Sequence, residues 1–193
     1  MKAADHVKQL EIHPLIPERW PDLETLFGPN GASAGCWCMY WRQSRAEFKA
    51  SRGENNHQAL QALAMSGKPL GLLAYADGKP VGWMAVAPRH DYPAMDASRV
   101  IKQLDEKKVW AISCFYTSPK YRRAGVTAAL IEASKEYVRQ HHGTIIEGYP
   151  IMPHSDKVSP GSAYTGLHSA FLKAGFKEVA RYSATRPIMR YEL

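Results

Sequence analysis

The sequence predicts an α+β domain, a sheet of short strands flanked by amphipathic helices. Apolar runs of strand length recur along the chain, and two of them are joined by Asp77-Gly78, a hairpin turn signal. Other stretches carry apolar residues at helical spacing, and no internal repeat or linker divides the chain. Because 193 residues suit one hydrophobic core, we expect a single domain over residues 1–193.

Local signals place the elements of the first half. A helix begins at Pro17 and is ended by the turn residues 28–31, and a second helix presents Leu60, Leu63 and Ala64 on one face. The chain is strand-like where it starts at Glu11. After this start we expect helices over 17–27 and 54–66, strands over 70–75 and 81–87, and a polar connection over 88–108.

The second half is built around a continuously apolar stretch, Val109 to Tyr116, which is typical of a buried central strand. It is followed by the longest helical pattern, with Gly143 placed as its C-cap. The elements expected are a strand over 109–116, a helix over 126–142, a strand over 144–149, a helix over 163–174 and strands near 176–181 and 186–191.

Composition narrows the class of protein. No apolar run approaches the roughly 18 residues of a membrane span, and the N-terminus lacks the apolar core of a secretory signal. Three cysteines do not suggest a disulfide framework, so we expect a cytoplasmic protein. The 25 Lys and Arg against 18 Asp and Glu give a net charge of +7, which favours an anionic partner: a phosphate-bearing cofactor, an acidic substrate or nucleic acid.

The stretch from Ile112 to Leu130 carries the chemistry. It combines a buried strand, a short basic loop and the start of a long helix, where free backbone N–H groups and the helix dipole favour an anion. Gly125 lets a phosphate approach the backbone, and Arg122 and Arg123 add charged donors. The glycine spacings of Walker and dinucleotide-binding loops are absent. The alternative is an ordinary basic surface turn.

This stretch resembles the acyl-CoA-binding motif Arg/Gln-x-x-Gly-x-Gly/Ala of the GNAT superfamily of N-acetyltransferases. Arg122 to Thr127 matches it, with Thr127 in the last small-residue position, and Ala174-Gly175-Phe176 also resembles the family. The resemblance covers about residues 70–191 and implies a central, mostly antiparallel, splayed sheet flanked by helices. It also implies acetyl-CoA as cosubstrate and direct acetyl transfer to an amine.

By the same resemblance, the strand end would contact pantetheine and the loop would hold the pyrophosphate. The residues implied are Phe115, Tyr116 and Thr117 for pantetheine, and Arg122, Arg123, Ala124, Gly125, Val126, Thr127 and Ala128 for the pyrophosphate.

The catalytic acid and base are less evident. The position of the family's usual tyrosine acid falls on Phe171, so we expect Tyr164 to serve instead, with Tyr116 and Tyr149 as further candidates. Glu147, a lone carboxylate in an apolar strand, is the candidate base, because partial burial raises a carboxyl pKa. The alternative for Glu147 is an ion-paired or edge-exposed side chain.

The acceptor site is expected among the aromatic residues of the segment Cys36–Trp41, namely Trp37, Tyr40 and Trp41. A metal site at Cys36 and Cys38 lacks further ligands at suitable spacing, so no metal is expected. His154 and Asp156 lie in a loop where an acceptor could enter, or are simply solvated.

The function expected is therefore acetyl transfer to a primary amine of an unidentified, small-molecule acceptor, without a membrane and possibly in a homodimer. Two other classes stay open. One is a non-catalytic module that binds or senses acyl-CoA, which the missing tyrosine at Phe171 suggests. The other is a nucleic-acid-binding protein that uses the basic turn Lys120–Arg123, although no longer basic stripe or reading motif accompanies it.

Overall fold

A computed structural model describes residues 9–99, 101–153, 161 and 163–193. Within them the chain forms one seven-stranded sheet of order β1-β2-β3-β4-β5-β7-β6, in which only β4 and β5 are parallel. The expected mostly antiparallel sheet is confirmed. Its strands are β1 (Leu10–Pro14), β2 (Gly71–Ala76), β3 (Lys79–Pro88), β4 (Trp110–Thr117), β5 (Ile145–Gly148), β6 (Lys177–Ser183) and β7 (Arg186–Glu192).

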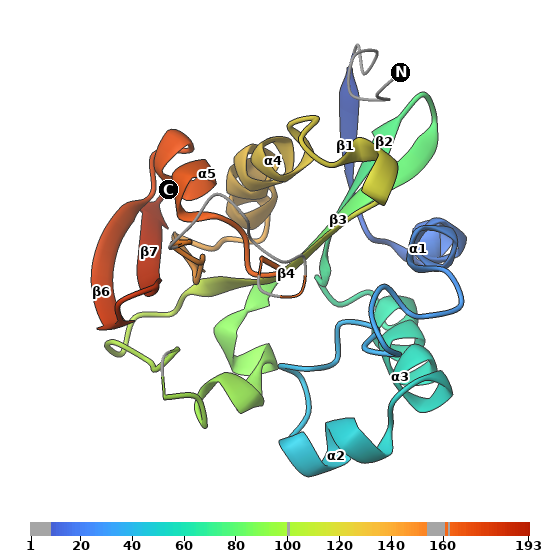
Figure 1. Ribbon diagram of the computed structural model, residues 1–193, viewed down its shortest axis with the longest axis horizontal. Coiled ribbons are helices and arrows are strands. Elements are labelled where there is room, and N and C mark those ends of the chain that lie inside the picture. The colour runs from blue at the N-terminus through green and yellow to red at the C-terminus, as the bar shows by residue number, and fades with distance from the viewer. Residues whose placement is uncertain (1–8, 100, 154–160, 162) are drawn as a thin grey trace.

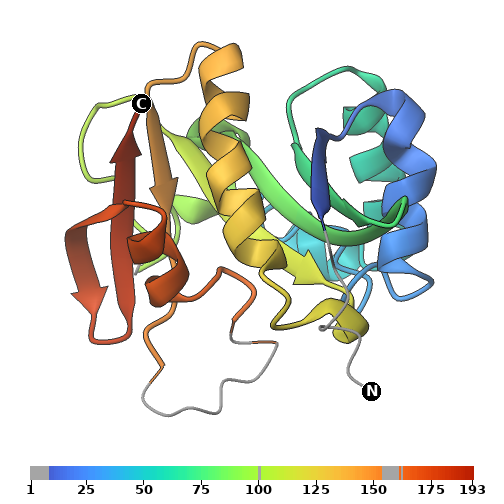
Figure 2. The same cartoon turned by 90° about the horizontal axis from the view of Figure 1, so that it is seen from above.

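Helices cover both faces of the sheet (Figures 1 and 2). The helix α4 (Val126–Gln140) crosses one face beside α5 (His168–Lys173), and α1 (Trp20–Phe27), α2 (Arg45–Ala50) and α3 (Glu54–Met65) lie on the other. Each face therefore has its own apolar core, one beneath α4 and one beneath α1 and α3. None of the helices in the described residues is both long and apolar enough to span a membrane.

The strand β4 is irregular where the site lies. Ala85 pairs with Cys114 but Val86 pairs with Ile112, so Ser113 is an extra residue that forms a β-bulge. Pairing with β5 ends at Ile112, although β4 continues to Thr117. Because β5 ends at Gly148, β4 beyond the bulge has no strand partner on this side, and this open edge corresponds to the splay that the family resemblance implies.

The helix expected over 163–174 is wrong in its first half, because α5 begins only at His168. Gly166 adopts a left-handed φ of +89°, and the Ile151 N–H donates to the Gly166 carbonyl at 2.9 Å. The His168 N–H in turn donates to the Ile151 carbonyl at 3.0 Å. These pairings to a distant segment replace the helical hydrogen bonds, although the apolar spacing suits a helix.

Three smaller corrections concern the flanking segments. The connection expected to be polar buries Tyr92, Met95 and Ile101 against the sheet.

The short α2, which we did not expect, begins with a capping box formed by Ser44 and Glu47, a recognisable sequence signal. At the end of α4 the left-handed residue is His142, at φ +60°. Gly143 is required for another reason, since a Cβ there would collide with the side chains of Val138 and Trp110.

Candidate active site

The basic loop and the start of α4 form a cradle open to solvent. Gly125 is the N-cap of α4 with φ +80°, and a Cβ built there would meet nothing within 4 Å. Arg122 and Arg123 beside it are exposed. A left-handed conformation favours glycine, and the open space around it leaves room for a bound group. Gly125 therefore fits the close-approach position that the sequence predicts.

Backbone donors converge on the same place. The Ala129 N–H donates to the Gly125 carbonyl at 3.0 Å, which is the first hydrogen bond of the α4 ladder. The N–H groups of Val126, Thr127 and Ala128 precede that bond, so they have no intrahelical acceptor. Helix α4 is held against the sheet at this end because Val126 packs on Gly82 of β3. The cradle therefore offers fixed N–H donors, a helix dipole and two arginines to an anion.

The splayed edge of β4 continues from this cradle. Alternate residues of a strand point their backbone groups to the same edge, so Phe115 and Thr117 face the gap beside β5 and Tyr116 faces β3. One of these groups is already bonded, because the Phe115 N–H donates to the Tyr164 carbonyl over 2.6 Å. The backbone groups of Thr117 have no strand partner on β5, so they are available to an extended ligand in the gap.

Tyr164 lies at the gap, half-buried, ahead of α5 rather than on it. Burial is the main cause that raises the pKa of its phenol, and the nearby Tyr40 and Cys114 raise this pKa further. The phenol is therefore protonated at neutral pH. These neighbours place Tyr164 between β4 and the aromatic segment that precedes α2.

Phe171, which takes the place of the expected tyrosine, is fully buried in the core beneath α4. Its ring meets Phe115 edge-on at 6.2 Å between centroids. A Cβ on Gly148 would collide with this ring, and a Cβ on Gly166 would lie 2.8 Å from it. Phe171 is therefore a packing residue that needs two glycines beside it.

Glu147 is buried and ion-paired, with 1% of the residue exposed. Its Oε1 accepts a hydrogen bond from the Tyr149 hydroxyl at 2.6 Å, and its Oε2 accepts one from the Arg190 Nε at 2.6 Å. Arg89 donates to the same Tyr149 hydroxyl at 2.7 Å. Arg190 also forms a bidentate pair with Asp105, at 2.7 and 3.1 Å. This geometry is the ion-paired alternative for Glu147, and nothing in the sequence had identified its arginine partners.

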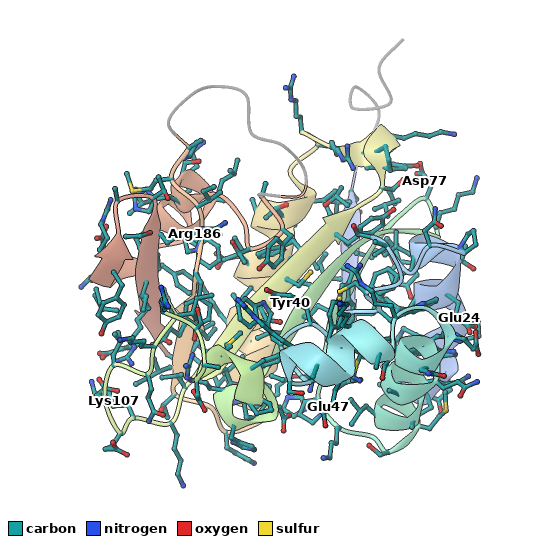
Figure 3. The ribbon with its side chains drawn as sticks, turned by 60° about the horizontal axis from the view of Figure 1, so that its bottom comes forward. Glu24, Tyr40, Glu47, Asp77, Lys107 and Arg186 are labelled. Carbon is teal, nitrogen blue, oxygen red and sulfur yellow. The ribbon has the colours of Figure 1, made fainter. Side chains whose placement is uncertain are left out.

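The three expected acceptor residues do not lie together. Tyr40 and Trp41 pack edge-on at 4.7 Å between ring centroids and line one cavity of about 440 Å³ beside α2 (Figure 3 labels Tyr40 and, on α2, Glu47). Trp37 lines a different cavity, of about 370 Å³, together with Glu24 and His57. Trp37 therefore does not share a pocket with the other two residues.

The cysteines form a small cluster on the same side of the sheet as Tyr40. The Trp83 Nε1–H donates to Cys38 Sγ at 3.1 Å. The interaction with the Cys114 thiol is the main cause that lowers the pKa of Cys38, and the same interaction raises the pKa of Cys114. In the described part of the chain no group of three or more His, Cys, Asp or Glu side chains is placed to hold a metal ion. His154 and Asp156 lie outside the described residues.

Comparison with known proteins places this geometry in a family. The model of the acetyltransferase (GNAT) family matches residues 35–148, more than half of the chain, and no curated protein sequence matches. One similar structure is PaiA N-acetyltransferase from Thermoplasma acidophilum in complex with coenzyme A, at 17% identity over 96% of this chain and 99% of that one, with a TM-score of 0.52.

Two further structures share the fold. Ribosomal-protein-alanine N-acetyltransferase from Brucella melitensis is 15% identical, with 95% and 99% of the two chains covered and a TM-score of 0.54. Aminoglycoside N-acetyltransferase AAC(6')-Iy, solved with coenzyme A, is 18% identical, with 90% and 91% covered and a TM-score of 0.55. At these identities the likeness concerns the fold alone. Together with the match to the family model, it shows that this chain belongs to the acetyltransferase (GNAT) family.

Proposed function

We propose that the protein is an acetyl-CoA-dependent N-acetyltransferase that moves the acetyl group directly to a primary amine of a small molecule. The observation that carries this proposal is the cradle at Gly125, which lies at the end of the strand whose splayed edge exposes Phe115 and Thr117. Acetyl-CoA is the cosubstrate of the family to which this chain belongs.

The cradle and the strand edge suit two different parts of that cosubstrate. The N–H groups of Arg123 and of residues 125–128, with the side chains of Arg122 and Arg123, hold the pyrophosphate by charge-assisted hydrogen bonds, whereas the Ala124 N–H already donates to the Tyr121 carbonyl at 3.3 Å. The backbone groups of Thr117 and Phe115 pair with pantetheine amides, and the Tyr164 carbonyl gives up the Phe115 N–H when pantetheine takes its place. We do not assign a pantetheine hydrogen bond to Tyr116, since its backbone groups face β3. Its proposed part in cofactor binding is limited to its place between Phe115 and Thr117 in this strand.

The reaction forms a bond between the amine nitrogen and the acetyl carbon and breaks the bond between that carbon and sulfur. The acceptor ammonium must first lose a proton, and the leaving thiolate gains one. We propose Tyr164 as the acid, because burial keeps its phenol protonated and its backbone carbonyl lies at the gap. We propose Glu147 as the base. Because both of its oxygens accept hydrogen bonds, this role requires the Tyr149 hydroxyl to relay the proton.

The test is release of free thiol from acetyl-CoA over a panel of primary amines, preceded by a thermal-shift comparison of acetyl-CoA, CoA and ATP. A ligand at about 100 times its Kd adds roughly 2.7 kcal/mol to stability, enough to raise Tm by several degrees. We expect both CoA species to stabilise the protein, ATP to have no effect, and thiol release to depend on an amine. Stabilisation without release from any amine would instead favour the acyl-CoA-sensing module.

A further inference from the structure

The cavity of about 440 Å³ beside α2 contains a cation whose hydrogen bonds are incomplete. Arg42 lines this cavity, yet its side chain is only 5% exposed. Burying a charge without partners is costly, so buried arginines usually have their donors paired. Arg42 follows this pattern only in part, because Asp91 balances its charge at 3.9 Å but its Nε donor has no partner among the described residues, so a ligand can supply an acceptor.

The contacts of Arg42 are few and long. Its Nη2 donates to the Tyr92 hydroxyl at 3.3 Å, and its guanidinium lies 4.5 Å from the centre of the Tyr92 ring. The nearest carboxylate, Asp91, lies 3.9 Å from Nη1, beyond hydrogen-bond distance. Its Nε is buried and has no hydrogen-bond partner among the described residues. A guanidinium presents its N–H donors in a planar fork that matches a carboxylate, so this one is suited to an anionic group.

A second donor lines the same cavity. The Nε1–H of Trp41 is also buried and unpartnered within the described part of the chain. The one acidic residue of the lining, Glu47, is already engaged, because it accepts a hydrogen bond from the Ser44 N–H at 2.8 Å in the capping box of α2. The cavity therefore favours an anion over a second cation.

Two tyrosines link the cavity to the strands of the site. Tyr92, which Arg42 contacts, is buried in the same apolar cluster as Ala111 of β4. On the other side, Tyr40 lines the cavity and lies close enough to Tyr164 to influence its phenol. An acceptor seated here would therefore extend from Arg42 towards the splayed edge of β4, with the apolar rings of Tyr40 and Trp41 along its side.

We propose that the acceptor is an amino acid or a similar small amino-carboxylic acid, whose carboxylate binds Arg42 and the Trp41 Nε1–H in this cavity. The inference rests on the proposed transfer activity and specifies its substrate class. The volume of about 440 Å³ lies within the range of roughly 300–1,000 Å³ typical of small-molecule sites.

The test compares each amino acid with the amine that lacks only its carboxylate, such as phenylalanine with 2-phenylethylamine and lysine with cadaverine. We expect kcat/KM to be roughly 10- to 100-fold higher for the amino acid, as for a charge-assisted hydrogen bond. In Arg42→Met this preference disappears while turnover of the matched amine persists. Arg42→Lys keeps the charge but loses the fork, and we expect it to raise KM for the amino acid more than it lowers kcat.

Arg45→Met is the matched control, because Arg45 lines the same cavity but is exposed. We expect it to leave the preference within about threefold of the unmodified protein, the range of a weak surface charge. Equal kcat/KM for the amino acids and their matched amines would overturn the inference and leave the proposed activity intact. A preference lost in Arg45→Met but kept in Arg42→Met would overturn the assignment to Arg42.

A binding experiment decides the question if no amine is turned over. N-acetylphenylalanine and its amide differ only in the carboxylate, so their effects on Tm in the presence of CoA report the site alone. We expect N-acetylphenylalanine to raise Tm and its amide to leave Tm unchanged. We expect the rise in Tm to be lost in Arg42→Met and in Arg42→Lys. The absence of any shift with the acid would reject the carboxylate site, and thermal melts of the variants alone verify that they fold.

Discussion

The backbone N–H of Phe115 donates to the carbonyl of Tyr164 over 2.6 Å, although the two residues lie 49 positions apart in the chain. This hydrogen bond joins the splayed edge of β4 to the segment ahead of α5. It brings the proposed acid to the edge along which pantetheine is proposed to bind. Replacement of the Tyr164 side chain leaves the backbone carbonyl in place, so the two contributions of this residue can be measured separately.

Tyr164→Phe removes the phenol and preserves the ring. We expect kcat to fall by about 10- to 100-fold, at the lower end of general acid effects because a CoA thiolate leaves with little assistance. The Kd for acetyl-CoA stays the same, since the substitution does not change the backbone carbonyl that pantetheine must displace from the Phe115 N–H. Steady-state kinetics with titration of acetyl-CoA checks both values. Unchanged kcat would exclude Tyr164 as the acid and direct attention to Tyr116.

Gly125→Val fills the cradle. A valine there adopts a left-handed φ at a cost of about 1–2 kcal/mol and occupies the space proposed for the pyrophosphate. We expect the Kd for acetyl-CoA to rise at least about tenfold, the loss of roughly one charge-assisted hydrogen bond.

Gly78→Val is the control for this change, because Gly78 has φ +70° and equally open surroundings in the turn between β2 and β3. We expect both variants to lose similar stability and only Gly125→Val to lose affinity for acetyl-CoA, as measured by calorimetry. Equal affinity in the two variants would mean that the pyrophosphate binds elsewhere.

Glu147→Gln distinguishes a catalytic role of this residue from a purely structural one. Glutamine keeps the shape and one acceptor oxygen but cancels the charge that faces Arg190. We expect the free energy of unfolding to fall by about 1–3 kcal/mol, as for a hydrogen bond to a charged group. If Glu147 is the base, kcat falls at least about tenfold while the Kd for acetyl-CoA stays constant. Lower stability with normal kcat would leave Glu147 an ion-paired structural residue.

Asp105 should make stability depend on acid pH. The hydrogen bonds from Arg190 lower the pKa of Asp105 in the folded protein below its ordinary value of about 3.9. Its contribution to stability is therefore complete above that value and is lost as the pH falls through the lower, folded-state pKa. We expect Asp105→Asn to be less stable than the unmodified protein at pH 7, and this difference in stability to shrink as the pH falls below about 3.9. Urea titrations across this range test the convergence.

The strands were predictable because hairpin turns and continuous apolar runs are local signals, and all the later strands lie within a few residues of their expected positions. The cradle was predictable too, since Gly125 and its basic neighbours are adjacent in sequence. The non-helical segment around Tyr164 was not, because distant partners, Phe115 and Ile151, override a helical apolar spacing. Arg42 was missed because nothing local distinguishes a buried arginine from an exposed one.

The contact between Phe171 and Gly148 has an evolutionary consequence. Because a side chain at residue 148 would occupy the space of the Phe171 ring, residue 148 cannot become larger unless residue 171 becomes smaller. Relatives of this protein should therefore vary the two positions as a pair, with a smaller side chain at 171 wherever 148 carries a Cβ. A tyrosine at 171 would likewise need room for its hydroxyl, because the ring at this position is fully buried.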